Sequence, residues 1–233
     1  MHISGLQKLT ALDFPDKLAC TVFTPGCNLR CPFCHNGSLV LRGREQTYPL
    51  EDFFAFLKKR RGILDGVCIT GGEPLLQPDL ADFIRQIRAL GFLVKLDTNG
   101  FFPERLQPLL EQGLVDYVAM DLKNSPRRYP ETCGFPQEDP EKFLAPVKKS
   151  IALLMGGKTP HEFRTTVVRQ LHTPEDIREA GLLISGAKKW FLQCFKDSGD
   201  ILSPGLSAPD RADLEAMQAV AAGFCERCEL RGV

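Results

Sequence analysis

The sequence lacks a long apolar run of the kind that spans a membrane, and its N-terminus has no basic segment followed by apolar residues. An excess of charge is also absent, because 29 lysines and arginines balance 29 aspartates and glutamates. That balance gives no general attraction to nucleic acid or to a membrane surface. Repeats, low-complexity tracts and a convincing linker are missing as well. We therefore expect a cytoplasmic protein that binds neither nucleic acid nor membrane.

Cysteine is plentiful but does not suggest a disulfide framework. The count of nine is odd, and three of the nine are clustered, which favours a reducing cytosol. With 233 residues, 43% of them hydrophobic, the chain can bury a full core. We expect one domain over residues 1–233, with an N-terminal cap at 1–17, a core at 18–203 and a C-terminal helix and tail at 204–233.

Strand and helix patterns alternate through the core. After a short strand or hairpin within residues 3–12, strands are expected near residues 18–23, 66–70, 92–96, 115–122, 161–168 and 188–195. Helices are expected at 50–61, 79–90, 103–112, 141–155, from 174 and at 210–222, with Pro108 and Pro146 as interruptions and residues 224–233 unassigned. Such alternation predicts βαβ units and a parallel sheet. About six parallel strands are fewer than the eight of a closed barrel, so we predict an open, partial (β/α)6 barrel.

A cysteine motif follows the first core strand. Cys27, Cys31 and Cys34 have C-x3-C-x2-C spacing on a loop that begins after Thr24, Pro25 and Gly26. Three thiolates can hold three irons of a [4Fe–4S] cluster and leave the fourth iron open for chemistry. A structural zinc site is the alternative, with His35 or the pair Cys225 and Cys228 completing four ligands.

The motif resembles a known family signature. C-x3-C-x-aromatic-x-C, with Phe33 as the aromatic residue, is similar to that of the radical S-adenosylmethionine (SAM) superfamily. The surrounding residues 12–17, 23–27 and 34–36 resemble activating proteins of anaerobic ribonucleoside-triphosphate reductase, a subgroup similar to pyruvate formate-lyase activating enzyme. The resemblance covers nearly the whole chain and becomes vague after Ser203. It implies the same open barrel fold.

Strand ends supply further candidates, because ligands of such sheets gather at the carboxyl ends of the strands. The residues Gly71, Gly72, Glu73 and Pro74 would by themselves be an ordinary turn. Their position matches the GGEP motif of the family, which implies that they hold the SAM amino group.

Charged residues end the next two strands. Asp97 and Thr98 resemble a strand-end pair of the family, and Asp121 matches the other acidic member of a monovalent-cation site beside the SAM carboxylate. Lys123 matches a lysine that contacts SAM. Asp121 and Lys123 alternate with Leu122, so both point to one face of the strand. Without the resemblance, they would be a solvated strand edge.

The resemblance implies three further SAM contacts. Arg164 matches an arginine near the SAM carboxylate and the incoming peptide, although a surface charge is an equal reading. Gln193 ends the last core strand, where the family contacts ribose and adenine. The backbone near Phe33 would meet the adenine edge.

The resemblance implies a radical SAM activase with a [4Fe–4S] cluster and SAM. Its partners would be a glycyl radical enzyme, anaerobic ribonucleoside-triphosphate reductase, and a small electron donor such as flavodoxin or ferredoxin. Alternatives are an activase of another glycyl radical enzyme, a small-molecule enzyme of the deazapurine carboxylate synthase type, or a non-catalytic zinc or iron–sulfur binding module. Residues 124–140 are a candidate partner contact or a plain connecting loop. Cys225 and Cys228 could form a disulfide, half of an intermolecular zinc site, or an inert pair.

Overall fold

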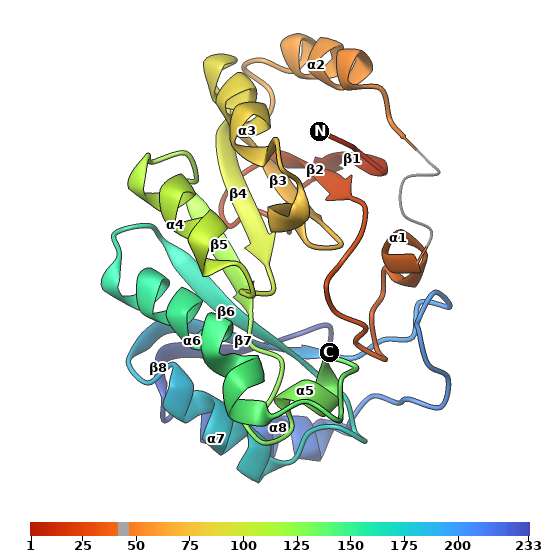
Figure 1. The fold of residues 1–233 in the computed structure, drawn as a ribbon, viewed down its shortest axis with the longest axis vertical. Coiled ribbons are helices and arrows are strands. Elements are labelled where there is room, and N and C mark those ends of the chain that lie inside the picture. Colours follow the sequence, from red (N-terminus) through yellow and green to blue (C-terminus); the bar gives the residue numbers. More distant parts are fainter. Residues whose placement is uncertain (42–46) are drawn as a thin grey trace. The chain divides into compact units, whose positions relative to one another are not determined.

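The structure is a computed structural model that describes residues 1–41 and 47–233. Strands and helices alternate along most of the chain (Figure 1). The chain forms two compact units. Unit 1 comprises Met1–Asn28, Ser38–Thr98 and Glu104–Ala119, and unit 2 comprises Leu29–Gly37, Asn99–Pro103 and Met120–Val233. The predicted domain limits at residues 17 and 203 stay a prediction.

The strands of unit 1 begin with an antiparallel pair. β1 (Gly5–Thr10) runs antiparallel to β2 (Ala19–Thr24), which confirms a short strand before the core. β2, β3 (Gly66–Gly71) and β4 (Leu93–Thr98) are parallel neighbours. β5 (Tyr117–Asp121) starts in unit 1 and ends in unit 2. Each of these strands overlaps a predicted one.

The helices of unit 1 lie between its strands in sequence. They are the short α1 (Gly37–Leu41), which begins at the last residue of a unit 2 segment, and α2 (Leu50–Lys59), α3 (Leu80–Ala89) and α4 (Pro103–Glu111). A 3₁₀ turn, η1 (Pro74–Leu76), follows β3. α2 and α3 bury the apolar residues that their spacing predicts, and the Phe53 and Phe83 rings pack with centroids 5.4 Å apart. These helices are held mainly by apolar burial.

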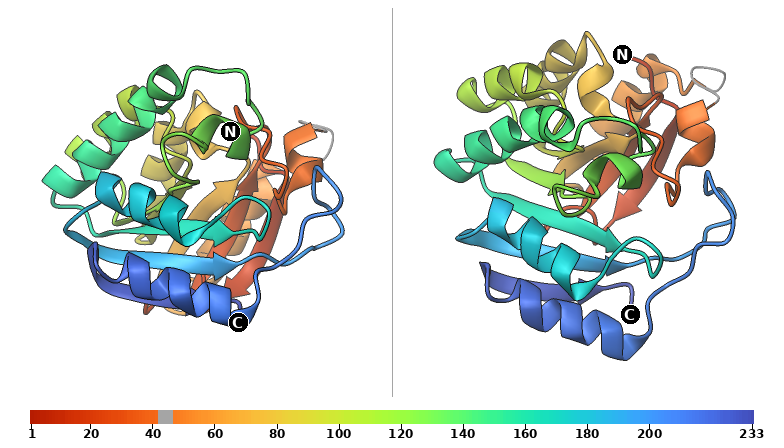
Figure 2. Two further views of the ribbon diagram at one scale, coloured as in Figure 1. Left: turned by 90° about the horizontal axis from the view of Figure 1, so that it is seen from below. Right: turned by 60° about the horizontal axis from the view of Figure 1, so that its bottom comes forward.

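Unit 2 contains a second parallel set of strands. β6 (His161–Val167), β7 (Ala187–Cys194) and β8 (Cys225–Arg231) pair in that order. Its helices are α5 (Tyr129–Thr132), α6 (Pro140–Gly156), α7 (Pro174–Leu183) and α8 (Arg211–Ala221). α7 begins at the predicted residue 174, and Thr173 caps it through a hydrogen bond from the Asp176 amide. α7 and α8 lie side by side, as both views of Figure 2 show.

Two local predictions were wrong, and one unassigned segment forms a strand. Pro146 does not interrupt α6, and Pro108 lies within α4. A proline removes one helical hydrogen bond, but α6 buries Leu144, Val147 and Leu154 along one face, which outweighs that loss. The unassigned tail forms β8, whose polar sequence gave no strand signal. Pairing with β7 supplies its hydrogen bonds instead.

The fold class is confirmed as mixed α/β with an open, mostly parallel sheet. Strand order follows chain order from β1 to β8, an arrangement that successive βαβ units can build. The antiparallel β1 and the unexpected β8 add to the six strands that the sequence predicts. None of the described helices combines the length and the apolar composition that a membrane span requires.

Candidate active site

The predicted site residues are divided between the two units. Unit 1 contains Cys27, the turn after β3 and the end of β4, while unit 2 contains Cys31, Cys34 and the ends of β5, β6 and β7. The site residues of each unit are therefore described separately.

In unit 1, the start of the cysteine loop is fastened to the turn after β3. The Gly72 and Glu73 backbone amides donate hydrogen bonds of 2.8 Å to the carbonyl oxygens of Thr24 and Gly26. A Cβ atom on Gly72 would lie 1.8 Å from the Gly26 oxygen, so only glycine allows this approach. Cys27, half-buried, follows directly. The resemblance assigns Gly71 and Gly72 to ligand binding. The structure shows in addition that Gly72 packs against the Gly26 backbone, which leaves no room for a side chain.

Glu73 is buried at the beginning of η1. Its side chain is 1% exposed, and its Oε1 atom accepts hydrogen bonds from the Leu75 amide at 3.0 Å and the Thr98 hydroxyl at 2.9 Å. Pro74 is the first residue of the 3₁₀ turn. The structure therefore brings two predicted site residues, Glu73 and Thr98, into direct contact. These two donors to Glu73 Oε1 are neutral groups, a backbone amide and a hydroxyl.

Asp97 has a partner that the sequence analysis missed. Lys95, two residues earlier on β4 and 1% exposed, forms an ion pair with the Asp97 carboxylate. Its Nζ atom also lies 3.8 Å from Cys68 Sγ. Alternation along a strand was the available signal, because residues 95 and 97 must share a face of β4.

In unit 2, Cys31 lies in surroundings that favour a thiolate. A hydrogen bond from the Cys133 thiol lowers the Cys31 pKa, burial opposes that effect, and the positive charge of Lys123 adds to the lowering. Cys34 differs, because burial raises its pKa. A thiolate is the form that ligates iron or zinc, so the donor chemistry of Cys31 fits a metal centre. Cys133, which belongs to no motif of the sequence, therefore contacts a predicted ligand.

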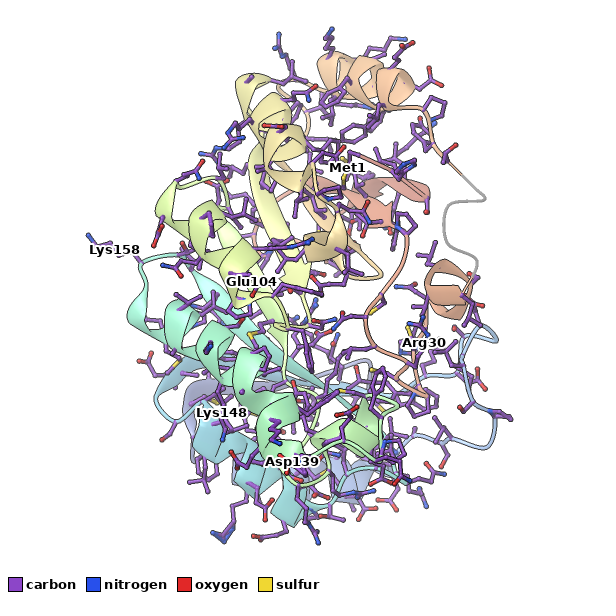
Figure 3. The ribbon with its side chains drawn as sticks, in the orientation of Figure 1. Met1, Arg30, Glu104, Asp139, Lys148 and Lys158 are labelled. Carbon is purple, nitrogen blue, oxygen red and sulfur yellow. The ribbon has the colours of Figure 1, made fainter. Side chains whose placement is uncertain are left out.

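The end of α5 supports the cysteine loop in unit 2. The Arg30 amide (Arg30 is labelled in Figure 3) donates a 2.9 Å hydrogen bond to the Cys133 carbonyl oxygen. Gly134 follows with φ +89°, and a Cβ atom there would lie 2.3 Å from the Arg30 oxygen. The Cys34 amide in turn donates to the Cys31 oxygen at 3.0 Å. Residues 30–34 are thus held by backbone contacts.

Asp121, Lys123 and Arg164 form one charged cluster. Asp121 accepts from Lys123 Nζ at 2.8 Å through one oxygen, and from Arg164 Nε and a terminal nitrogen at 3.2 and 3.1 Å through the other. Burial acts to raise the Asp121 pKa, but the two cations outweigh it and lower the pKa overall. For Lys123, burial acts to lower the pKa, and the Asp121 charge raises it well above its usual range. Arg164 is therefore not the simple surface charge that was its alternative reading.

The cluster lies near the cysteine loop of unit 2. Two positive side chains, Lys123 and Arg164, share the Asp121 carboxylate. Lys123 Nζ is 5.9 Å from the centroid of the Phe33 ring, so three predicted site residues of unit 2 are connected through Lys123. Gln193 lies near the end of β7, paired in register with Thr166 and Arg231.

Two residues outside the predicted set position this cluster. His172 is 2% exposed, and its Nε2 atom is 2.8 Å from the Lys123 carbonyl oxygen while its Nδ1 atom is 3.1 Å from the Val168 amide nitrogen. Tyr129, fully buried, contacts the Lys123 amide through its hydroxyl at 3.3 Å. Residues 124–133 include α5 and are largely buried, so the choice between a partner contact and a connecting loop stays open for residues 124–140.

A family model described as the radical SAM superfamily matches residues 21–167, and the chain belongs to that superfamily. A protein of Methanocaldococcus jannaschii named as a candidate glycyl-radical enzyme activating enzyme is 31% identical over 99% of this chain and 96% of its own. This chain is accordingly an enzyme of the radical SAM activating type.

Two further similarities are partial. The pyruvate formate-lyase-activating enzyme of Listeria monocytogenes is 34% identical over 65% of this chain and 59% of its own length. The structure of Streptococcus suis SuiB bound to S-adenosylmethionine has a TM-score of 0.65 and 16% identity, covering 91% of this chain and 52% of SuiB. At 16% identity, the similarity to SuiB supports the fold alone, and this chain spans about half of SuiB.

The family implies a [4Fe–4S] cluster and SAM, and the residues present fit both. The motif provides three cysteines, and one of them, Cys31, has a lowered pKa. The described residues contain no preassembled group of three metal-ligating side chains. The assignment of Cys27, Cys31 and Cys34 as ligands therefore stays a prediction from spacing and thiol chemistry.

Proposed function

We propose that this enzyme activates anaerobic ribonucleoside-triphosphate reductase by installing a glycyl radical on it. Similarity over nearly the whole chain to a candidate glycyl-radical enzyme activating enzyme, together with the cysteine motif, supports the activase reaction. The choice of the reductase as partner rests on the resemblance of residues 12–17, 23–27 and 34–36 to the activating proteins of that reductase. When bound, the cluster would supply an electron to SAM, which breaks its S–C5′ bond and gives methionine and a 5′-deoxyadenosyl radical. That radical would take a hydrogen atom from a partner glycine, leaving 5′-deoxyadenosine.

The chain's residues would bind SAM at its charged ends. Cys27, Cys31 and Cys34 would hold the cluster. Glu73 would attract the SAM amino group, with Gly71, Gly72 and Pro74 shaping the turn that presents it. A buried carboxylate is suited to this role because low dielectric strengthens its attraction for a cation.

The charged cluster of unit 2 would attract the SAM carboxylate. Lys123 and Arg164 carry the positive charge that a SAM carboxylate requires. Gln193 and the backbone at Phe33 would contact the nucleoside part. A monovalent cation at Asp97, Thr98 and Asp121 is left out of the proposal, because both carboxylates have ammonium or guanidinium partners.

The partner would complete the site. A 5′-deoxyadenosyl radical reacts with most C–H bonds, so the glycine loop of the reductase would have to enter before SAM is cleaved. A small electron donor such as flavodoxin or ferredoxin would reduce the cluster. Residues 135–140 are the exposed part of the predicted partner segment, since residues 124–133 are largely buried.

The proposal is tested by measuring 5′-deoxyadenosine with and without the partner. We expect reconstituted enzyme, reductant and SAM to form it at least about tenfold faster when the reductase of the same organism is added. Equal rates with and without the reductase would contradict the choice of partner. A reductase whose glycine is replaced by alanine is the control, because it can dock while a methyl group replaces one of the two Cα hydrogens of the glycine and hinders abstraction of the other.

A further inference from the structure

Lys95 is a buried lysine of unit 1, two residues before the predicted site residue Asp97 on β4. It lies in the middle of β4, is 1% exposed, and is among the largest fully buried side chains of the protein. A lysine is almost never buried so completely unless its charge is paired. The pairing group is Asp97, a residue that the sequence assigned to SAM or cation binding.

The strand geometry places the two members of this ion pair side by side. Residues 95 and 97 share one face of β4 because side chains alternate along a strand. Cys68 on β3 is the cross-strand neighbour of Lys95, and its Sγ atom is 3.8 Å from both Lys95 Nζ and Asp97 Oδ1. Lys95 and Asp97 thus both pack against the Cys68 thiol. A neutral thiol cannot balance the charge of a carboxylate, whereas the Lys95 side chain can.

We infer that Lys95 is the built-in counter-ion of Asp97 and replaces the monovalent cation that the family resemblance implies. The inference rests on the proposed function, because it assigns Asp97 to the SAM site. A sodium or potassium ion at Asp97 would lie beside a buried ammonium of the same sign, which disfavours its binding. Thr98, the neighbouring candidate ligand, donates its hydroxyl hydrogen to Glu73.

Asp121 in unit 2 is also paired with cationic side chains. Asp121 is shared by Lys123 and Arg164, through different carboxylate oxygens. An added cation would there too meet charge of its own sign. Each carboxylate predicted to bind a cation is therefore neutralised by side chains of its own unit. SAM binding by this protein is expected to be independent of monovalent cations.

The first test needs no variant and no partner protein. SAM affinity of the reconstituted holoenzyme is measured by calorimetry in potassium, sodium or tetramethylammonium chloride at equal ionic strength. Tetramethylammonium is too large to enter a cation site, so we expect dissociation constants within about twofold in all three salts. A loss of tenfold or more in tetramethylammonium, about 1.4 kcal/mol, would overturn the inference.

The second test isolates the pair by apparent melting temperature. Lys95→Met leaves Asp97 buried without its counter-ion and should lower the melting temperature by about 10 °C, whereas Lys95→Met with Asp97→Asn should regain most of it. If the double variant melts no higher than Lys95→Met, Lys95 does not serve Asp97. If Lys95→Met does not fold, recovery of a folded double variant gives the same answer.

A surface lysine is the matched control. Lys148 lies on α6 (labelled in Figure 3) and pairs with Glu141 at 2.8 Å, with 42% of its side chain exposed. Lys148→Met should change the melting temperature by only about 1 °C, because exposed pairs contribute little.

Both tests measure only SAM binding and protein stability. Failure of the reductase to acquire a radical would consequently leave this inference standing, and cation-dependent SAM binding would leave the proposed function standing.

Discussion

At the residue scale, the two predicted cluster ligands of unit 2 are not equivalent. Cys31 is buried with a lowered pKa, through the Cys133 hydrogen bond and the Lys123 charge, whereas burial raises the pKa of Cys34. Cys31 is thus the better thiolate before a metal binds, and a bound metal would deprotonate either thiol. The difference makes Cys31 the most informative cysteine to replace.

Cys31→Ala is expected to remove the cluster and the activity together. Iron in the reconstituted protein should fall from about four per chain to about one or fewer, because two cysteines do not retain a stable cube. Iron analysis and the visible absorption spectrum measure this. Cys225→Ser is the control, since Cys225 lies on β8 outside the predicted site. A full complement of iron in Cys31→Ala would show that this ligand assignment is wrong.

Glu73→Gln separates charge from structure in the turn after β3. Glutamine keeps an oxygen to accept from Leu75 and Thr98, so η1 should persist, while the attraction for the SAM amino group is lost. We expect SAM affinity to fall about 10- to 100-fold with the cluster intact. Thr98→Val, which removes one hydrogen bond but keeps the Glu73 charge, should have a smaller effect. Unchanged affinity in Glu73→Gln would refute the role of Glu73 in binding.

At the element scale, α5 and the cysteine loop are held together by backbone atoms. Gly134→Ala forces a side chain into a left-handed conformation at φ +89° and against the Arg30 oxygen. We expect a loss of about 2 kcal/mol or more in stability, and faster loss of iron to a chelator. Gly156→Ala is the matched control, because a Cβ atom there meets nothing within 4 Å. Equal behaviour of the two variants would mean that α5 does not support the loop.

β8 is a second element whose importance can be measured. Arg231 forms a two-point ion pair with Glu162 of β6 at 2.9 and 3.3 Å, and its guanidinium carbon lies 3.4 Å from the Phe191 ring centroid. Glu162 is 1% exposed. Arg231→Met should lower the free energy of unfolding by about 3 kcal/mol, because it removes the guanidinium partner of a buried carboxylate. Denaturant titration measures the loss, and a change below about 0.5 kcal/mol would contradict it.

The sequence predicted elements with strong periodicity and failed where context decides. Phe53 and Leu57 of α2, or Phe83 and Ile87 of α3, mark their helix by spacing alone. β8 has the polar sequence CERCELR, and only a neighbouring strand makes it a strand. The sequence likewise did not identify Lys95 and Cys133 as site residues, because context decides their roles too. Their importance comes from contacts with Asp97 and Cys31 that no motif encodes.

At the scale of the whole molecule, the two units carry different charged groups. Unit 1 contains the buried Glu73 side chain and the Lys95–Asp97 ion pair, and in unit 2 Lys123 and Arg164 share the Asp121 carboxylate. A carboxylate suits the SAM amino group, and a lysine or arginine suits the SAM carboxylate. The proposed function requires in addition that SAM cleavage produce a radical that ends on a protein.

An electron paramagnetic resonance spectrum tests that requirement most directly. Anaerobically reconstituted enzyme, reductant and SAM are mixed with the anaerobic ribonucleoside-triphosphate reductase of the same organism, and the frozen sample is recorded. The account predicts a glycyl-type doublet that requires SAM and is absent with Cys31→Ala. A fully loaded cluster that neither cleaves SAM nor gives a doublet would contradict it.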